Sequence, residues 1–308
     1  LLRVATVAPR TRTAVHNLPT KMKKLINLTV MCIVAIAALA QEKADILVSY
    51  ECKTPGFERK EVKRDMTLLA NASKSKYFNS ISLWTDSLSS TPEGKAKLDE
   101  IIRANCLVMH PDGYEYWDLT KGPVKNIYTY VFNDITSGLQ TVYDEWADEL
   151  HYYTESLEEQ TWDIFADSTA TVLEYECIMA KTDYHGRKWT AWFAPDIPLS
   201  FGPWKFRGLP GLILKAEVDG GFSFIATGME KSDRAMTPMY SKGEYSEISR
   251  IKAQEEHEYF VNNQESILKA QNGGLAKITY ADENGNEISA PVYDALIMSL
   301  EPDYKKKK

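Results

Sequence analysis

The spacing of apolar and polar residues divides the first third of the chain into three strands and a helix. Apolar residues run together or alternate in Ile46–Cys52, Lys63–Ala70 and Tyr77–Trp84, a pattern typical of strands. Ser90–Glu93 supplies a hydroxyl cap, a proline for the first turn and a glutamate, which together indicate the start of a helix. Apolar residues then recur at near-helical spacing, which predicts a helix over Pro92–Asn105.

The middle of the chain has the pattern of successive antiparallel strands joined by turns. Glycine, proline, asparagine and aspartate gather between the apolar runs, as they do in tight turns. Asp219–Gly221 is a hairpin signal between two of these runs, and Asp183–Gly186 supplies an earlier turn. The predicted strands are Leu107–His110, Tyr114–Leu119, Asn126–Phe132, the strand-rich segment Thr141–Leu157, a strand from Ala170 that carries Leu173, Tyr175, Cys177 and Met179 on one face, Lys188–Phe193, Leu212–Val218 and Phe222–Thr227.

A second helix and a last hairpin follow. A broken apolar stripe predicts a helix over Ser246–Ala270, ended by Gly273-Gly274. Leu275–Ala281 and Glu287–Val292 then flank an Asp-Glu-Asn-Gly turn. Together the elements predict a mainly β fold of the α+β class: a curled antiparallel sheet or barrel-like meander with one or two packed helices.

The N-terminal region has the pattern of a secretory leader. Lysines precede an apolar run of about 15 residues, shorter than the ~20 that a helix needs to cross a bilayer. Ala38 and Ala40 supply a cleavage site, so we expect a mature chain that begins at Gln41, has no membrane span, and is periplasmic or associated with the outer membrane. Cys32 follows Met31 inside the apolar run, which argues against a lipoprotein. The expected divisions are a segment upstream of the true start at 1–21, a signal peptide at 22–40, one β-rich domain at 41–304 and a disordered basic tail at 305–308.

Charge excludes one class of function. The whole chain has a net charge of −7 at pH 7. Residues 1–40 hold six basic residues and no acidic ones, so their removal leaves 30 Lys and Arg against 43 Asp and Glu, a net charge of −13. A surface this acidic repels nucleic acid and anionic membranes, which excludes a nucleic-acid-binding function.

The segment Arg187–Leu214 is the most distinctive part of the chain. Its 28 residues include three Trp, three Phe, four Pro and three Gly, and Gly208–Ile213 reads GLPGLI. Over about Trp162 to Gly228 the chain resembles the GLPGLI family, secreted proteins of Gram-negative bacteria that are named after this hexapeptide and have no settled biochemical function. It departs from the family pattern at Met179, where a lysine is expected. The matching residues are Trp162, Tyr175, Cys177, Ala180, Gly186-Arg187, Ala191-Trp192, Ile197-Pro198, Gly202-Pro203-Trp204-Lys205 and Gly208 to Leu214.

The cysteines leave several states open. Cys52, Cys106 and Cys177 are an odd number for an oxidising compartment, which allows any one of three pairings or three reduced, buried thiols. Cys177 falls where the GLPGLI pattern has its cysteine. The resemblance therefore implies that Cys52 and Cys106 form the disulfide, if one forms.

The hexapeptide has two interpretations. Pro210 presets one torsion and Gly211 is expected to supply a positive φ, as in a type II turn that leads into a buried strand. Alternatively, the loop forms a rigid aromatic rim that binds a ligand or partner, because Trp and Arg are frequent anchors of binding surfaces. The candidate binding residues are Arg187, Trp192, Trp204, Lys205, Phe206, Arg207, Gly208, Leu209, Pro210 and Gly211.

Catalytic and metal-binding patterns are weak. His110, His151, His185 and His257 lack metal-ligand spacing, no Gly-x-Ser-x-Gly motif occurs, and Glu158-Glu159 is typical of solvated surface. No cofactor is expected. The sequence favours a secreted, non-catalytic cell-envelope protein that binds a small ligand, a peptide or an outer-membrane partner through the rim. The alternative is a periplasmic hydrolase with dispersed carboxylates.

Overall fold

The structure is a computed structural model, and it describes residues 42–56, 61–109, 115–118, 121–125, 127–146, 149–157, 160–219, 221–239, 245–271, 280–281, 287–289 and 292–306. The chain divides into two compact units, Leu1–Glu42 and Lys43–Lys308. Only Glu42 of the first unit is described, so the predicted upstream segment and signal peptide lie outside the described residues. Within the described part of the chain, no helix has the length and apolar character needed to span a membrane.

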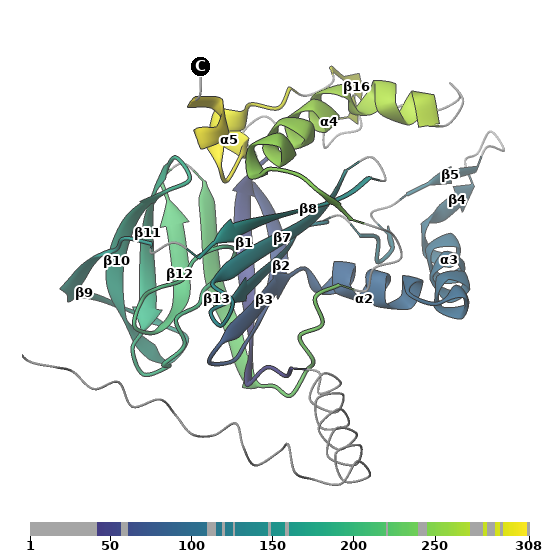
Figure 1. The fold of residues 1–308 in the computed structure, drawn as a ribbon. Coiled ribbons are helices and arrows are strands. Elements are labelled where there is room, and N and C mark those ends of the chain that lie inside the picture. The colour runs from purple at the N-terminus through teal and green to yellow at the C-terminus, as the bar shows by residue number, and fades with distance from the viewer. Residues whose placement is uncertain are drawn as a thin grey trace, which may run out of the picture. The chain divides into compact units, whose positions relative to one another are not determined.

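The second unit is built on one large open sheet (Figure 1). Its strands are β1 (Ile46–Pro55), β2 (Glu61–Ala70), β3 (Lys74–Phe78), β6 (Tyr130–Asp134), β7 (Leu139–Trp146), β8 (Glu149–Ser156), β9 (Asp163–Val172), β10 (Tyr175–Tyr184), β11 (Arg187–Ala194), β12 (Leu212–Val218), β13 (Phe222–Lys231) and β14 (Ser246–Glu247). The order is β14-β8-β7-β6-β3-β2-β1-β13-β12-β11-β10-β9, and every pair is antiparallel except β14 with β8. The mainly β prediction is confirmed, and the sheet is not closed into a barrel.

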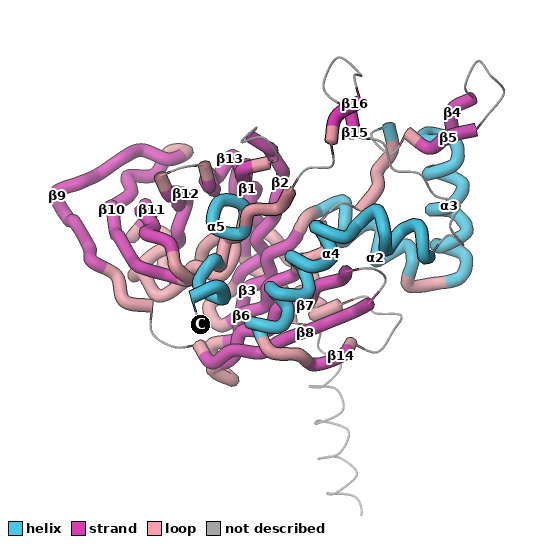
Figure 2. Tube along the Cα trace, turned by 90° about the horizontal axis from the view of Figure 1, so that it is seen from above, coloured by secondary structure: helices cyan, strands magenta, loops and turns pink. Residues whose placement is uncertain are grey.

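Helices and two small hairpins accompany the sheet. They are α2 (Ser80–Ser89), α3 (Pro92–Cys106), α4 (Arg250–Gln271), α5 (Ala295–Met298), the 3₁₀-helix η3 (Pro302–Lys306), and the pairs β4 (Leu107–Met109) with β5 (Glu115–Trp117) and β15 (Tyr280–Ala281) with β16 (Glu287–Ile288). α4 lies across β7 and β8 (Figure 2). Both predicted long helices are present as α3 and α4, but α4 begins at Arg250, and Ser246 and Glu247, predicted to start this helix, form β14. Lys305 and Lys306, predicted to belong to a disordered tail, are the last residues of η3, whereas 307–308 lie outside the described residues.

The predicted strand Tyr77–Trp84 is wrong beyond β3, because Asn79 starts a helix there. The Asn79 side-chain oxygen accepts hydrogen bonds from the backbone N–H groups of Ile81 and Ser82, both at 3.1 Å. This caps α2 and satisfies donors that a helix start leaves free. Ser82 is fully buried, whereas Ile81 is 41% exposed. The apolar run is therefore divided by the helix: Ile81 and Trp84 lie on its outer side, whereas Leu83 packs against an apolar cluster.

The strand predicted from Ala170 is two strands. Leu173 and Glu174 form the turn between β9 and β10, and Leu173 takes a positive φ of 55°. Leu173 is 36% exposed as a result, whereas Cys177 is fully buried in β10 as predicted. Because the alternation of apolar residues continues through Leu173 and Glu174, the sequence pattern does not reveal the turn.

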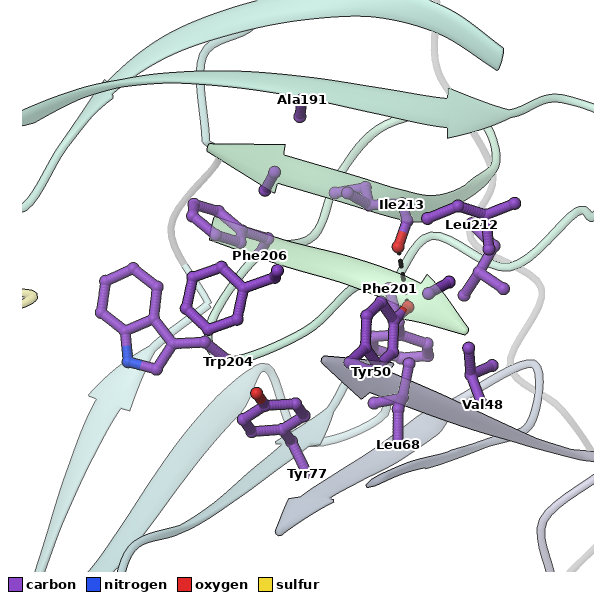
Figure 3. Packing of buried hydrophobic residues seen from close by; sticks show 14 of the residues in the cluster. Val48, Tyr50, Leu68, Tyr77, Ala191, Phe201, Trp204, Phe206, Leu212 and Ile213 are labelled. Carbon is purple, nitrogen blue, oxygen red and sulfur yellow. Dashed lines mark hydrogen bonds between the residues drawn. The ribbon is translucent and has the colours of Figure 1, made fainter. Parts of the chain in front are cut away.

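The two faces of the sheet contribute to separate apolar clusters. Leu68 and Leu69 are neighbours in β2 but belong to different clusters, because successive strand residues point to opposite faces. In the larger cluster, Figure 3 shows Tyr50 beside Phe201, with its hydroxyl donating to the backbone carbonyl of Ile213 at 2.8 Å. The loop that follows β11 is thus part of the main core.

Candidate functional site

The loop between β11 and β12, residues 195–211, is closed by its own backbone hydrogen bonds. The Gly208 N–H donates to the Ser200 carbonyl at 3.1 Å, and the Leu212 N–H donates to the Ile197 carbonyl at 3.0 Å. These bonds satisfy backbone groups that burial removes from water. The loop, called the motif loop below, is therefore a compact part of the fold.

The backbone torsions of the two glycines in the hexapeptide differ from those predicted for a type II turn. Gly208 takes the positive φ, +89°, whereas Gly211 is not among the residues with a positive φ. A Cβ atom on Gly211 would lie 2.3 Å from the carbonyl oxygen of Ala194. The predicted positive φ at Gly211 is therefore wrong. Glycine is needed at this position because the backbone of Ala194 lies too close to leave space for a side chain.

The prediction of a projecting aromatic rim is wrong for the centre of the motif loop. Trp204, Lys205, Phe206 and Leu209 are 5%, 0%, 0% and 1% exposed. The rings of Trp204 and Phe206 lie side by side (Figure 3), with centroids 5.2 Å apart. Both rings also pack on Trp189. Of the other candidates, Arg187, Trp192 and Arg207 are half-buried, Gly211 is buried, and Gly208 and Pro210 are exposed.

Two side chains just before β9 hold the motif loop. The Gln160 amide donates to the Lys205 carbonyl at 3.1 Å and accepts from the Arg207 N–H at 3.0 Å. The Trp162 indole donates to the Arg207 carbonyl at 2.9 Å. Trp162 was among the residues of the family resemblance, whereas nothing in the sequence pointed to Gln160.

Lys205 extends from the motif loop into a buried charge cluster. Its Nζ lies 2.8 Å from Glu155 Oε2 on β8 and 2.8 Å from Glu301 Oε1. Arg250, near the start of α4, lies between the same two carboxylates at 3.2 and 2.9 Å. Arg250 also forms a bidentate pair with Asp303 at 3.0 and 2.9 Å. These five residues are called the charge cluster below.

The charge cluster favours the ionised forms of Glu301 and Asp303. Burial alone would raise the pKa of Glu301, but Lys205, His185 and Arg250 bring it below its usual value. Burial likewise opposes ionisation of Asp303, but hydrogen bonds with His185 and Arg250 hold its pKa well below the usual range. Buried charges are tolerated when each is paired and hydrogen-bonded. The pairing favours a structural role for these carboxylates over acid–base chemistry.

Arg187, the first residue of β11, binds backbone carbonyls near the C-terminus. Its guanidinium donates to Leu296 O at 2.9 Å, Ile297 O at 3.1 Å and Ser299 O at 2.9 Å. Arg187 and Lys205, two candidates for gripping a ligand, thus bind the chain's own C-terminal residues. Sequence reasoning missed Glu155, Arg250, Glu301 and Asp303, which no short motif connects.

The outer edge of β9 is a second feature of interest. β9 is the last strand of the sheet, and no described strand pairs with its other side. Its first five residues are all exposed, and Ile164 and Phe165 keep 48% and 41% of their surface. Its pairing with β10 shifts register between Phe165 and Thr169, which marks a bulge. A long edge of this kind is able to pair with another strand.

The histidines do not form a metal site in the described part of the chain, where no group of three metal ligands occurs. His151 lies 3.5 Å from Glu256, and His185 lies 3.6 Å from Asp303. His257 stacks on Trp146, with ring centroids 4.0 Å apart, and burial lowers its pKa to about 4. His110 and Glu158-Glu159 lie outside the described residues.

The three cysteines in the described part of the chain are not bridged. Cys52, Cys106 and Cys177 are buried and free, so the disulfide between Cys52 and Cys106 is not formed and three reduced, buried thiols are observed. The Cys52 sulfur lies 3.0 Å from the hydroxyl of Tyr77. Burial raises the pKa of Cys52 to about 12, which keeps its thiol protonated and unreactive.

Comparison with known proteins finds a similarity to one family over part of the chain. The model of a family described as "Protein of unknown function (Porph_ging)" matches residues 151–215, which include the hexapeptide. Two solved structures of PNGF-II, in the C2 and P21 space groups, are similar, with TM-scores of 0.45 and 0.46 and identities of 15% and 14%. The likeness covers 68% and 70% of this chain but 32% and 33% of theirs, so the chain spans about a third of their length. No curated protein matches the chain. Over residues 151–215 the chain is therefore similar to a family whose function is unknown.

Proposed function

We propose that the protein is exported to the cell envelope and binds an extended segment of a partner protein along the free edge of β9. The observation that carries the proposal is the edge itself, a strand of ten residues with Ile164 and Phe165 exposed. The opposite end of the sheet differs, because β8 is followed by the two-residue β14 and crossed by α4. Addition of a partner strand supplies main-chain hydrogen bonds, while exposed side chains select the sequence.

The charge of β9 indicates the kind of partner. The strand carries Asp163 and Asp167 and no basic residue. A second copy would bring like charges together in a chain that is already acidic, and like charges across strands are destabilising. A segment that alternates basic and β-branched residues complements both the carboxylates and the apolar side chains. The bulge between Phe165 and Thr169 limits pairing to two short runs, which discourages open-ended strand addition.

Export is supported by the leader pattern before Gln41 and by the resemblance to a secreted family. The charge of the mature chain also suits a protein that does not adhere to anionic membrane. We place the protein in the periplasm or at the outer membrane.

One experiment tests both parts of the proposal. Protein recovered from cells that express the full chain should be found in the periplasmic fraction with Gln41 as its first residue. This protein should bind a short labelled peptide of alternating lysine and valine, measured by fluorescence anisotropy, and bind the glutamate–valine analogue about tenfold more weakly. Amide hydrogen exchange should slow in β9 on binding.

The matched variants place charge at two exposed apolar sites each. Ile164→Lys with Phe165→Lys should weaken peptide binding by about tenfold or more. Ile135→Lys with Leu139→Lys, at positions 50% and 43% exposed beside the β6–β7 turn, should leave binding unchanged. Equal binding by both double variants would reject the β9 edge. Retention of residues 22–40 in the recovered protein would reject export.

A further inference from the structure

The C-terminal segment, residues 296–306, is attached to the sheet by side chains from three separate elements. Arg187 on β11 donates to backbone carbonyls of the segment, as described above. Lys205 of the motif loop binds Glu301, and Arg250 of α4 binds both Glu301 and Asp303. In these contacts the cations come from the body of the fold, and the segment supplies the carbonyl and carboxylate acceptors. At the end of the segment the direction is reversed, because Lys305 and the Tyr304 hydroxyl bind Glu258 of α4.

The fit between the segment and its site is close. Glu301 is only 2% exposed, although it lies five residues before the last described residue of the chain. The turn at Gly186 packs directly on the segment, since a Cβ there would lie 3.0 Å from the backbone nitrogen of Asp303. His185 in the same turn lies 3.6 Å from the Asp303 carboxylate. The site therefore recognises two carboxylates two residues apart together with the backbone that precedes them.

Charge balance shows what the site requires. Around residues 296–303 the body contributes three cationic side chains, Arg187, Lys205 and Arg250, and the carboxylate of Glu155, which pairs with two of them. Departure of the segment would leave Lys205, which is buried while the segment is in place, and the adjacent Arg250 with Glu155 as the one remaining carboxylate of the charge cluster. An excess of buried positive charge is costly. The site is thus complementary to an acidic segment and disfavours an empty state.

The apolar attachment of the segment is small and largely separate from the main core. Tyr304 forms a cluster with Tyr293 and with Ile251, Val261 and Met298, apart from the cluster between the strands. Leu300 packs against the main core as a partly buried residue, whereas Leu296 is 61% exposed. An element with few buried apolar contacts requires less free energy to unfold locally than the core of the protein does.

We propose that Arg187, Lys205 and Arg250 form a receptor site for an extended acidic segment, which the C-terminal segment occupies in cis and for which an acidic segment of a partner competes. The partner segment has the pattern Glu-x-Asp. This proposal is independent of partner binding at β9, because the residues and the charge of the ligand differ.

The test uses the full chain with a weakened cis occupant. Glu301→Gln with Asp303→Asn keeps the size of both side chains but removes their charge. A labelled peptide of residues 294–306 should bind this variant about tenfold or more tightly than it binds the wild-type protein. The same peptide with glutamine and asparagine at the two positions should bind the variant about tenfold more weakly than the acidic peptide. Circular dichroism and a melting curve establish that the variant is folded.

A second measurement covers the case in which the variant does not fold. In the wild-type protein, amides of residues 299–306 should exchange before those of β8 and β12, and excess acidic peptide should accelerate their exchange several-fold, because the peptide occupies the site whenever the segment leaves. Exchange of the segment only together with the core, unchanged by the acidic peptide, would overturn the proposal. Equal binding of acidic and neutral peptides to a folded variant would also overturn it.

Discussion

Gly211 and Lys205 are fixed by their surroundings in opposite ways. Gly211 is held by the close approach of the Ala194 backbone, which leaves no space for a side chain. Lys205 is held by attraction, with two carboxylates each 2.8 Å from its ammonium group. Desolvation of a lysine costs several kcal/mol, and only paired, well-placed carboxylates offset that cost. Both residues belong to the motif loop. Packing and ion pairing within the fold therefore account for the presence of these residue types in the loop.

Gly211→Ala should destabilise the protein. The added methyl group meets the Ala194 carbonyl oxygen at 2.3 Å, so the backbone must shift, at a cost of about 1–3 kcal/mol in the free energy of unfolding. Gly228→Ala is the control, because nothing lies within 4 Å of a Cβ there, and it should change the free energy by less than about 0.5 kcal/mol. Urea unfolding measures both. Equal effects of the two substitutions would contradict the steric explanation.

At the scale of elements, a single capping residue separates β3 from α2. Asn79 accepts two backbone N–H bonds of α2, and its amide donates to the Asp65 carbonyl of β2 at 2.7 Å. It therefore couples the start of the helix to the neighbouring strand. The cap of α3, Thr91, makes only one such bond, to Gly94 at 3.1 Å, and is exposed.

Asn79→Ala should cost more stability than the corresponding change at α3. Loss of the buried cap and of the bond to β2 should lower the free energy of unfolding by about 2 kcal/mol. Thr91→Ala removes one exposed bond and should cost about 0.5–1 kcal/mol. Chemical denaturation of the two variants under the same conditions compares these values. The assignment of Asn79 as the decisive residue fails if its variant loses no more stability than the Thr91 variant.

At the scale of the molecule, two half-buried titratable side chains have opposite effects on the free energy of unfolding as pH changes. Burial raises the pKa of Asp144 on β7 to about 7 and lowers that of His257 on α4 to about 4. Between these values the folded state holds a proton on Asp144 that the unfolded chain releases, so this group adds stability as pH falls. Over nearly the same range the unfolded chain protonates His257 and the folded state does not, so this group removes stability as pH falls.

Single variants should separate the two opposing contributions to the pH dependence of the free energy of unfolding. Asp144→Asn leaves His257 uncompensated, so the free energy of unfolding should fall by about 2 kcal/mol between pH 7.5 and pH 5. His257→Phe retains a ring on Trp146 and leaves Asp144 uncompensated, so the free energy should rise by a similar amount over that interval. The wild-type protein should change little. Urea titrations at both pH values decide the matter, and slopes of the same sign in the two variants would contradict the compensation.

The sequence by itself determined most strands, both long helices and the meander from β10 to β13. These features follow from local chemistry: alternating burial for strands, helical spacing and a cap for α3, and glycine or asparagine at turns. Prediction from the sequence failed where one local pattern is compatible with two different structures. The apolar alternation at Tyr77–Trp84 also fits a capped helix, and the alternation around Leu173 continued through a turn.

Only the tertiary structure decided the roles of the candidate site residues. A tryptophan or lysine in a loop is equally compatible with exposure and burial until neighbouring elements are placed, so the rim interpretation of Trp204 and Lys205 was not testable from the sequence. The partners of Lys205 lie 50 residues before it, at Glu155, and far beyond it, at Glu301. The free edge of β9 is likewise a property of strand order. Local sequence patterns indicate which face of a helix or strand is exposed to solvent. Buried ion pairs and open sheet edges depend instead on which distant segments of the chain pack side by side.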